Sequence, residues 1–453
     1  MVNTFQLFYN ILLSKGYEMS NISIKRNSHM FFLILQTGFI AYFLVFCCPM
    51  ALAVLPETKQ NTQVKNDFKL PEGLSYNSQK KNNHIIHILS IDPKYYRLDL
   101  VKAHNQVFGR ETVKSIALRK GAIAAINAGF FEIGNSEDGR PSGTLIINGD
   151  IFSLAKNKRA LLVFNENKLD MGNIEIEFNL LVGKEKIAPN KINQFAKNDD
   201  IILYNHTFGP TSLTPYDRRE ILIDKKGIIT QIVEHGDNAI PRSGWILSFP
   251  SSHSMDFAKV GKKVTFNTTF KDPQNQNNAK WAGMKNFLMG IPMLVENGQA
   301  ITDLEKLGSK SFAEKPHART ALGVKSEGTL VMVVVEHTYS QALEQITIEQ
   351  MRNILREKGH TQKAIEEMKT LEMFSIIRDE ISNESNIGLS LPDLANLMVT
   401  LGCHQAINLD GGGSSTLFLN GHIMNTTIGD KDESQGLNTL RPVSDAIVVT
   451  KRI

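Results

Sequence analysis

The stretch SLPDLANLMVTLGCHQAINLDGGGSST, residues 390–416, contains a helix, a strand and a glycine-rich loop that together decide the fold. Ser390 can cap the helix, apolar residues recur through it at helical spacing, and Gly402 ends it. The strand Ala406–Leu409 follows, so Asp410 stands at the carboxyl end of a strand. Folds that combine helices and strands tend to bind ligands there. We therefore expect a ligand site centred on Asp410.

The loop that begins at Asp410 is the strongest functional motif of the chain. Three glycines after an acid let the backbone approach a ligand closely, and their amide groups can form an anion-binding concavity that suits a phosphate oxygen. A tight strand connection with solvated serines is the alternative. No Lys follows the glycines and no Gly-x-Ser-x-Gly pattern is present, so neither a P-loop nor a serine nucleophile is predicted. The candidate substrate-binding residues of this loop are Gly411, Gly412, Gly413, Ser414 and Ser415.

Most of the remaining chain reads as short strands separated by turns. The predicted strands are His84–Ile91, Tyr95–Val101, Ala122–Ala128, Leu145–Ile147, Leu161–Phe164, Ile201–Tyr204, Glu220–Ile223, Val264–Thr268, Met293–Val295, Leu330–Glu336, Ala406–Leu409 and Ala446–Thr450. We therefore predict an α+β fold, with a β-rich mixed-sheet single catalytic domain over residues 84–453 and flanking helices.

A charged stretch at about 341–386 differs from the β-rich body, because its apolar residues recur at helical intervals. It predicts one or two amphipathic helices inserted into the domain. A packed surface excursion and a lid or partner-binding helix remain alternative roles.

The N-terminus predicts export. Residues 1–55 combine a polar start with the apolar run 31–55 and a small-x-small pattern at 51–53, as in a signal peptide. The run is long enough to be an uncleaved membrane anchor instead. Residues 56–83 are polar and read as a linker. We expect a periplasmic, secreted or lumenal protein that meets a membrane only through this segment.

Composition excludes some classes of protein. A net charge of +4 over 453 residues, without a basic stripe, does not favour nucleic acid as a partner. Of the three cysteines, Cys47 and Cys48 lie in the apolar N-terminal run, and Cys403 reads as a small buried filler. Spaced His or Cys ligands for zinc are lacking, so no metal ligand is predicted. A hard cation such as calcium, held by Asp410 and main-chain oxygens, is the one cofactor left open.

Three further segments place functional groups at strand ends. Asn127 can hydrogen-bond a sugar hydroxyl, and Phe130 can stack on a sugar ring, although a turn cap and a core aromatic are equally good interpretations. Arg319 begins a strand with a guanidinium suited to phosphate. Glu336 ends the apolar strand Leu330–Glu336 in a carboxylate. A surface arginine and a solvated strand end are the commoner interpretations of the last two.

Together these segments resemble the phosphodiester glycosidase family. The motifs that carry the resemblance are Ile126–Phe131, Arg319–Gly323 and Asn408–Thr416, supported by Gly290–Pro292, Asn297–Gly298 and Arg441–Ala446. It extends roughly from His84 to the C-terminus, apart from the insertion, and it implies hydrolysis of a glycosyl phosphodiester with an N-acetylglucosamine-like sugar. The chain has Glu336-His337-Thr338 where the family usually has Asp-Gly-Arg, and Asp445 where Asn is more frequent.

The resemblance leads to a set of expected roles. Glycosidases commonly place two carboxylates beside the anomeric carbon, and Asp410 and Glu336 are the expected pair. Arg319 and the amides of residues 411–414 would offset charge on the departing phosphate, while Asn127 would orient the sugar. Two rival functions remain: a non-catalytic envelope protein that binds phosphate-bearing glycans, and a phosphodiesterase that cleaves the phosphorus–oxygen bond.

Overall fold

The computed structural model describes residues 69–452, except for 82–83, 156–158, 167, 272–280, 282, 308, 337–347, 370–371, 374–375, 378–387, 428–429 and 433–436. The predicted signal segment, residues 1–55, lies outside the described residues, and so does most of the predicted linker. None of the helices that the structure describes is long and apolar enough to cross a membrane.

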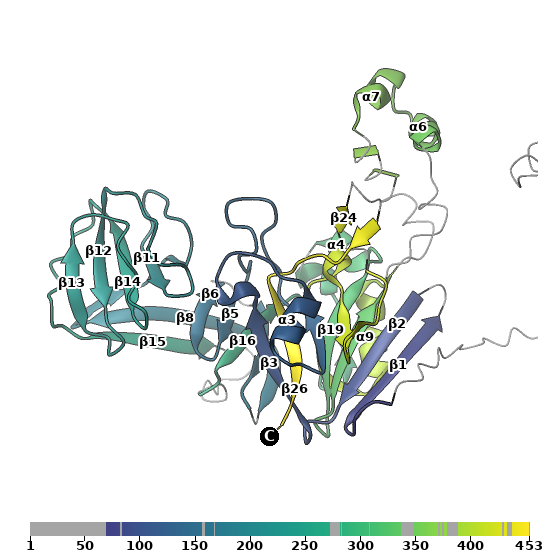
Figure 1. Ribbon diagram of the computed structural model, residues 1–453, viewed down its shortest axis with the longest axis horizontal. Coiled ribbons are helices and arrows are strands. Elements are labelled where there is room, and N and C mark those ends of the chain that lie inside the picture. The colour runs from purple at the N-terminus through teal and green to yellow at the C-terminus, as the bar shows by residue number, and fades with distance from the viewer. Residues whose placement is uncertain are drawn as a thin grey trace, which may run out of the picture. The chain divides into compact units, whose positions relative to one another are not determined.

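One of the sheets is antiparallel and has seven strands (Figure 1). In order across the sheet, its strands are β1 (Leu74–Lys81), β2 (His84–Ile91), β20 (Leu330–Val335), β19 (Arg319–Lys325), β21 (Cys403–Asn408), β17 (Met293–Glu296) and β18 (Gln299–Ala300). All six residues of β20 are buried, which is typical of a strand whose two faces are both covered. Glu336 follows β20 directly, and Asp410 follows β21.

A second sheet packs against one face of the first. Its strands are β23 (His422–Ile423), β22 (Leu417–Leu419), β4 (Ala124–Asn127), β26 (Asp445–Lys451) and β3 (Tyr96–Lys102). Because side chains alternate along a strand, Met332 and Val334 of β20 share a core with Ile126 and Ile447 of this sheet. The outer face of the second sheet is covered by α3 (Val113–Arg119).

The other face of the first sheet is covered by α9 (Leu391–Thr400) and the short helix α4 (Lys310–Glu314). The predicted helix is confirmed: the Ser390 hydroxyl accepts a hydrogen bond from Asp393 N, and Gly402, just after the helix, has a φ of +81°. Cys403 is buried, as predicted, and burial raises its pKa to about 11. The end of α9 thus fixes where β21 begins, and the end of β21 fixes where the Asp410 loop begins.

Two larger sheets and the two-stranded sheet of β24 (Asp430–Asp432) and β25 (Leu437–Thr439) complete the described body. One consists of β15 (Val264–Lys271), β8 (Leu169–Val182), β7 (Arg159–Phe164), β16 (Asn286–Gly290), β5 (Leu145–Ile147) and β6 (Asp150–Ser153), with β9 (Glu185–Ile187) paired to β8. The other consists of β10 (Lys191–Ile192), β11 (Ile202–Asn205), β14 (Trp245–Pro250), β12 (Arg218–Ile223) and β13 (Ile229–Val233). Only β10 and β11 are parallel among the strand pairs described, and the predicted β-rich α+β fold is confirmed.

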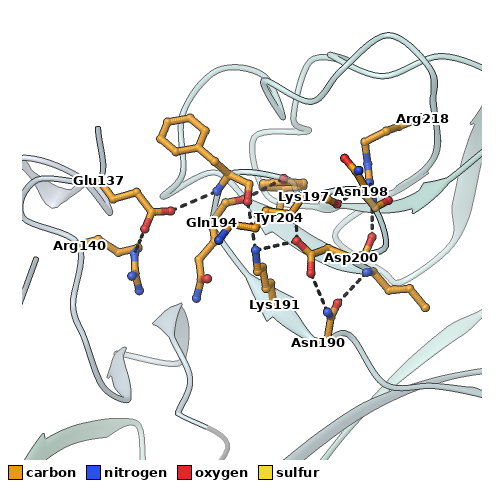
Figure 2. Close-up of polar contacts among 12 residues, drawn as sticks. Glu137, Arg140, Asn190, Lys191, Gln194, Lys197, Asn198, Asp200, Tyr204 and Arg218 are labelled. Atoms are coloured by element: carbon orange, nitrogen blue, oxygen red, sulfur yellow. Dashed lines mark hydrogen bonds and ion pairs between the residues drawn. The ribbon is translucent and has the colours of Figure 1, made fainter. Parts of the chain in front are cut away.

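A polar network ties the sheet that contains β11 to the loop after β4 (Figure 2). Asp200 forms an ion pair with Lys191, with 2.6 Å between Oδ2 and Nζ. The buried Arg218 donates hydrogen bonds to the main-chain carbonyls of Lys197 and Asp200. Glu137 accepts a hydrogen bond from the backbone N–H of Phe195 at 3.4 Å. The loop that follows Asn127 and Phe130 in the sequence is therefore tied to this sheet through Glu137.

The structure contains regular elements inside the predicted linker and inside the predicted insertion. Strand β1 lies within the predicted linker 56–83 and pairs with β2 over its full length, so this part of the linker is a strand. Its polar sequence LSYNSQKK disguises it, because an edge strand needs only one buried face. Helices α6 (Ile348–Glu357) and α7 (Gln362–Glu367) lie within the predicted insertion 341–386 and share a small apolar core. The role of the insertion stays a prediction.

Gly290, at the end of β16, supplies a test of how closely this strand approaches β21. A Cβ on Gly290 would lie 2.4 Å from the carbonyl oxygen of Asn408, whereas a Cβ on Gly172 in β8 would meet nothing nearer than 3.9 Å. We expect Gly290→Ala to lower the free energy of unfolding by about 2–4 kcal/mol, because β21 must shift. Gly172→Ala is the matched control and should change it by less than about 1 kcal/mol. Urea unfolding measures both, and equal effects would contradict the close approach.

Candidate active site

The first sheet brings the two predicted acids to the same end of its central strands. Strand β19 lies between β20 and β21 and is antiparallel to both, with Arg319 opposite Val335 and Ala321 opposite Asn408. Strands β20 and β21 are therefore parallel to each other, and their carboxyl ends meet at the start of β19. With two strand spacings between them, the backbones at Glu336 and the Asp410 loop lie about 10 Å apart.

Each glycine of the loop is required for a different reason. A Cβ on Gly411 would lie 2.7 Å from the carbonyl oxygen of Ala318, and Gly412 has a φ of +61°. A Cβ on Gly413 would lie 2.4 Å from Cζ of Arg441, so the guanidinium lies directly against the loop backbone. The three glycines thus allow a sharp turn that is closed on one side by β19 and on the other by Arg441.

Most of the loop amides already donate hydrogen bonds within the protein. The bonds are Gly411 N to Asp410 Oδ1, Gly412 N to Ala318 O, Ser414 N to Gly411 O and Ser415 N to Gly412 O. The predicted phosphate site made of these amides is therefore not favoured by the observed contacts. The same bonds hold the loop rigid, which a preorganised site requires.

The environment of Asp410 raises its pKa to about 6. Burial is the largest cause, because removal from water penalises the charged form, and the nearby Asp445 adds to the rise. The Ser414 hydroxyl, the Gly411 amide and the positive charge of Arg441 oppose it. A carboxyl group that titrates near pH 6 can exchange a proton with a reacting group under mild conditions.

Asn127 holds the loop in place. The side chain has no exposed surface; its Nδ2 donates to the carbonyl oxygen of Asp410 at 2.6 Å, and its Oδ1 accepts from the Thr320 hydroxyl at 2.8 Å and Thr416 N at 3.1 Å. These contacts join β4, β19 and the loop. The geometry favours a positioning role, and the predicted hydrogen bond to a sugar stays a prediction.

Arg319 is on the helix side of the sheet and its guanidinium is 2% exposed. Its Nη2 donates to the carbonyl oxygens of Phe312 and Lys315, and its Nε donates to that of Leu389, each at 2.9 Å. Burial lowers the pKa of Arg319 to about 10. These contacts anchor α4 and the residues before α9, so they do not favour the predicted phosphate contact, which no observation tests directly.

Glu336 is buried, with 4% of its surface exposed. Its Oε1 accepts hydrogen bonds from Thr426 N at 2.6 Å and contacts His87 Nε2 at 2.8 Å, while Oε2 has no partner. The neighbouring Asn425 donates to the carbonyl oxygen of Ser415 at 3.0 Å, which connects this acid to the glycine loop. The predicted catalytic role of Glu336 stays a prediction.

The remaining predicted substrate contacts lie around the same loop. Ser414 and Ser415 are buried, and neither hydroxyl has a hydrogen-bond partner among the residues that the structure describes. The Ser414 hydroxyl still lies close enough to Asp410 to lower its pKa. Phe130 is partly exposed and meets Phe312 edge-on, with ring centroids 6.2 Å apart. The predicted stacking of Phe130 on a sugar stays a prediction.

Asp445 forms a second buried acid beside the loop. It has no exposed surface, accepts a hydrogen bond from Gly129 N at 2.6 Å through Oδ1, and has no partner at Oδ2. Burial raises its pKa, and the positive charge of Lys102 opposes that rise. Lys102 is buried opposite Asp445 on β3, and burial lowers its pKa to about 8.

In the part of the chain that the structure describes, no group of three or more His, Cys, Asp or Glu side chains could hold a metal ion. The carboxylates nearest the loop are Asp410 and Asp445, and each has a cationic side chain close enough to lower its pKa.

Sequence reasoning missed two residues. Arg441 lies in a segment that contributed to the family resemblance, but nothing in its local pattern indicated that it contacts Gly413. His87 lies in a predicted strand and contacts Glu336 only because β2 pairs with β20. Alternation could have placed His87 on a buried face, since Leu89 and Ile91 share that face.

A carboxyl group of raised pKa beside a guanidinium is typical of enzyme sites that act on charged substrates. The chain belongs to the phosphodiester glycosidase family, whose sequence model matches residues 221–366 and 370–450. The matched residues include Arg319, Glu336, Asp410 and Arg441, whereas His87 and Asn127 lie before them.

Relatives of known sequence or structure agree with the fold. An uncharacterized protein of Rickettsia conorii is 36% identical over 288 residues, which cover 63% of this chain and 99% of the relative. A hypothetical protein from Synechocystis has a similar structure, with a TM-score of 0.60 at 19% identity. The match covers 84% of this chain and 62% of that protein. A protein from Burkholderia pseudomallei also has a similar structure, with a TM-score of 0.56 at 18% identity; the match covers 82% of this chain and 74% of that protein. These two likenesses show the fold alone.

The raised pKa of Asp410 predicts a pH-dependent cost of folding. Because its pKa rises from 3.8 to about 6, the folded protein disfavours the ionised form, and stability falls as the pH rises through this range. Asp410→Asn removes this cost, so above about pH 6 we expect it to be more stable than wild type by on the order of 1–3 kcal/mol. The two proteins should converge below about pH 4, where both side chains are neutral. Urea unfolding across the pH range measures the difference.

Two neighbours of Asp410 should move this transition in opposite directions. Asp445→Asn removes a negative charge and should lower the pKa of Asp410, while its amide oxygen can still accept from Gly129 N. Arg441→Gln removes a positive charge and should raise it. Each is compared with the same variant carrying Asp410→Asn, so that general effects on stability cancel. Shifts in the same direction would contradict the assigned environment.

Proposed function

We propose that the protein is an exported hydrolase that releases an N-acetylglucosamine-like sugar from a glycosyl phosphodiester. The observation that carries the proposal is the position of Asp410: at the carboxyl end of β21, with a pKa raised to about 6 and the charge of Arg441 acting on it. Membership of the phosphodiester glycosidase family supports the reaction class.

The reaction breaks the bond between the anomeric carbon and a phosphate oxygen, and the phosphate monoester leaves with the bonding electron pair. Above about pH 6 Asp410 is ionised, and a desolvated carboxylate can accept a proton from attacking water or attack the anomeric carbon itself. Glu336 is the second carboxylate of the proposed pair. Because phosphate leaves as a stable anion, strong acid assistance is not required.

Arg441 is the proposed partner of the departing phosphate. A guanidinium carries a permanent charge and donates two parallel hydrogen bonds to a phosphate. Gly413 has no side chain, so Arg441 can lie against the loop next to Asp410. Arg319 donates to three main-chain carbonyls on the helix side of the sheet. Phe130 would stack on the sugar ring, and Asn127 would act by holding the loop.

The direct test is to incubate the full chain with N-acetylglucosamine 1-phosphate diesters, including a nucleotide sugar, in ¹⁸O-labelled water. We expect free sugar that carries the label, because the carbon–oxygen bond breaks. Asp410→Asn should lower kcat by about 10³-fold or more, as expected for loss of a catalytic carboxylate. Asp217→Asn, an exposed acid before β12, is the matched control and should behave as wild type.

Three outcomes would overturn the proposal. Label in the phosphate would indicate a phosphodiesterase that cleaves the phosphorus–oxygen bond. Saturable binding of the same diesters without release would indicate a glycan-binding envelope protein. Full activity of folded Asp410→Asn would remove Asp410 from the mechanism.

Export is part of the same proposal. The apolar run 31–55 with its small-x-small pattern supports it. We expect the expressed full-length chain to leave the cytoplasm and to begin near residue 54 after processing. N-terminal sequencing of the fractionated protein checks this; an intact N-terminus in the cytoplasmic fraction would contradict export, and one in the membrane fraction would indicate an anchor.

A further inference from the structure

A buried row of polar side chains leads from the N-terminal strand pair to Glu336. The Tyr76 hydroxyl of β1 lies 2.7 Å from Nδ1 of His87 on β2, and Nε2 of His87 lies 2.8 Å from Oε1 of Glu336. The register of the sheet creates this row, because His87 is opposite Ser78 on one side and Val334 on the other. Diagonal neighbours on paired strands are within reach of aromatic and long side chains.

The chemistry of the three groups determines which atoms donate. Oε1 of Glu336 already accepts a hydrogen bond from Thr426 N, so we assign Nε2 of His87 as a second donor to this oxygen. In a neutral imidazole Nδ1 then accepts, and the Tyr76 hydroxyl donates to it. The histidine orientation is thus fixed from both sides, in the way that a catalytic base is commonly oriented by a third group.

Burial of these polar side chains lowers the stability of the fold unless hydrogen bonds compensate for the lost contact with water. His87 is 3% exposed and Glu336 is 4% exposed, and the face that they share is otherwise apolar, with Leu89, Met332 and Val334. A buried carboxylate destabilises a fold unless its oxygens are well partnered. Here both partners, His87 and Thr426 N, contact Oε1, and Oε2 is buried without one. Among the residues that the structure describes, the carboxylate is therefore held through Oε1 alone.

We propose that His87, oriented by Tyr76, is a positioning residue that fixes the Glu336 carboxylate through Oε1. The proposal rests on the function proposed above, since it assigns Glu336 its place in that site. Tyr76 and His87 precede residues 221–450, the span of the family match. The N-terminal strand pair thus completes the site rather than only extending the sheet.

Paired substitutions in the full chain separate positioning from packing. His87→Leu fills the space without a donor, and His87→Gln offers an amide Nε2 that can donate to Oε1. We expect His87→Leu to lower kcat by about 10–100-fold with KM changed less than about 3-fold, as expected for an outer partner of a catalytic group. His87→Gln should recover most of that loss, and Tyr76→Phe should lower kcat by a few-fold. His206→Leu, on an exposed histidine after β11, is the matched control.

The decisive comparison is a double-mutant cycle with Glu336→Gln. If His87 acts through Glu336, His87→Leu has little further effect on kcat in the Glu336→Gln background. Equal losses in both backgrounds, or no rescue by His87→Gln in a folded protein, would overturn the proposal. If wild type shows no turnover, the proposed function fails, and the same cycle is run on the Kd for N-acetylglucosamine 1-phosphate. Non-additive effects on Kd would still support positioning, and additive effects would overturn it.

Discussion

The pairing of β19 with both of its neighbours is the constraint on which the candidate site depends. Because β19 is antiparallel to β20 and to β21, two strands that are distant in the sequence end at the same edge. Each of them then delivers an acid. Asn127 secures this arrangement from the second sheet, since its amide bonds to Thr320 of β19 and to the loop at Asp410 and Thr416.

The local signals of the sequence predicted much of this arrangement. The Ser390 cap, the apolar spacing and Gly402 predicted α9, and alternating or continuous apolar runs predicted strands such as β2, β5 and β20. The glycine loop after Asp410 was recognised because three glycines have few other uses. Strand β1 was missed, because a polar edge strand has the composition of a linker.

What the sequence did not reveal depends on contacts between distant segments. The predicted phosphate partner, Arg319, points to the helix side of the sheet, and its place beside Phe312 and Leu389 follows from packing that no local pattern encodes. Arg441 reaches the loop because β26 pairs with β4, and His87 reaches Glu336 because β2 pairs with β20. Residue types could be recognised as suited to phosphate or proton transfer, but their partners required the fold.

The insertion begins and ends at two anchored points. Glu336, just before it, is held by His87 and Thr426 N, and Leu389, just after it, pairs with His317 and accepts a hydrogen bond from Arg319. The entropy of closing a loop grows only slowly with its length, so the excursion between these points can lengthen or shorten without loosening the sheet. In evolutionary terms, this is a place where a lineage can exchange whole segments while the strands that lead to Glu336 and Asp410 keep their pairing.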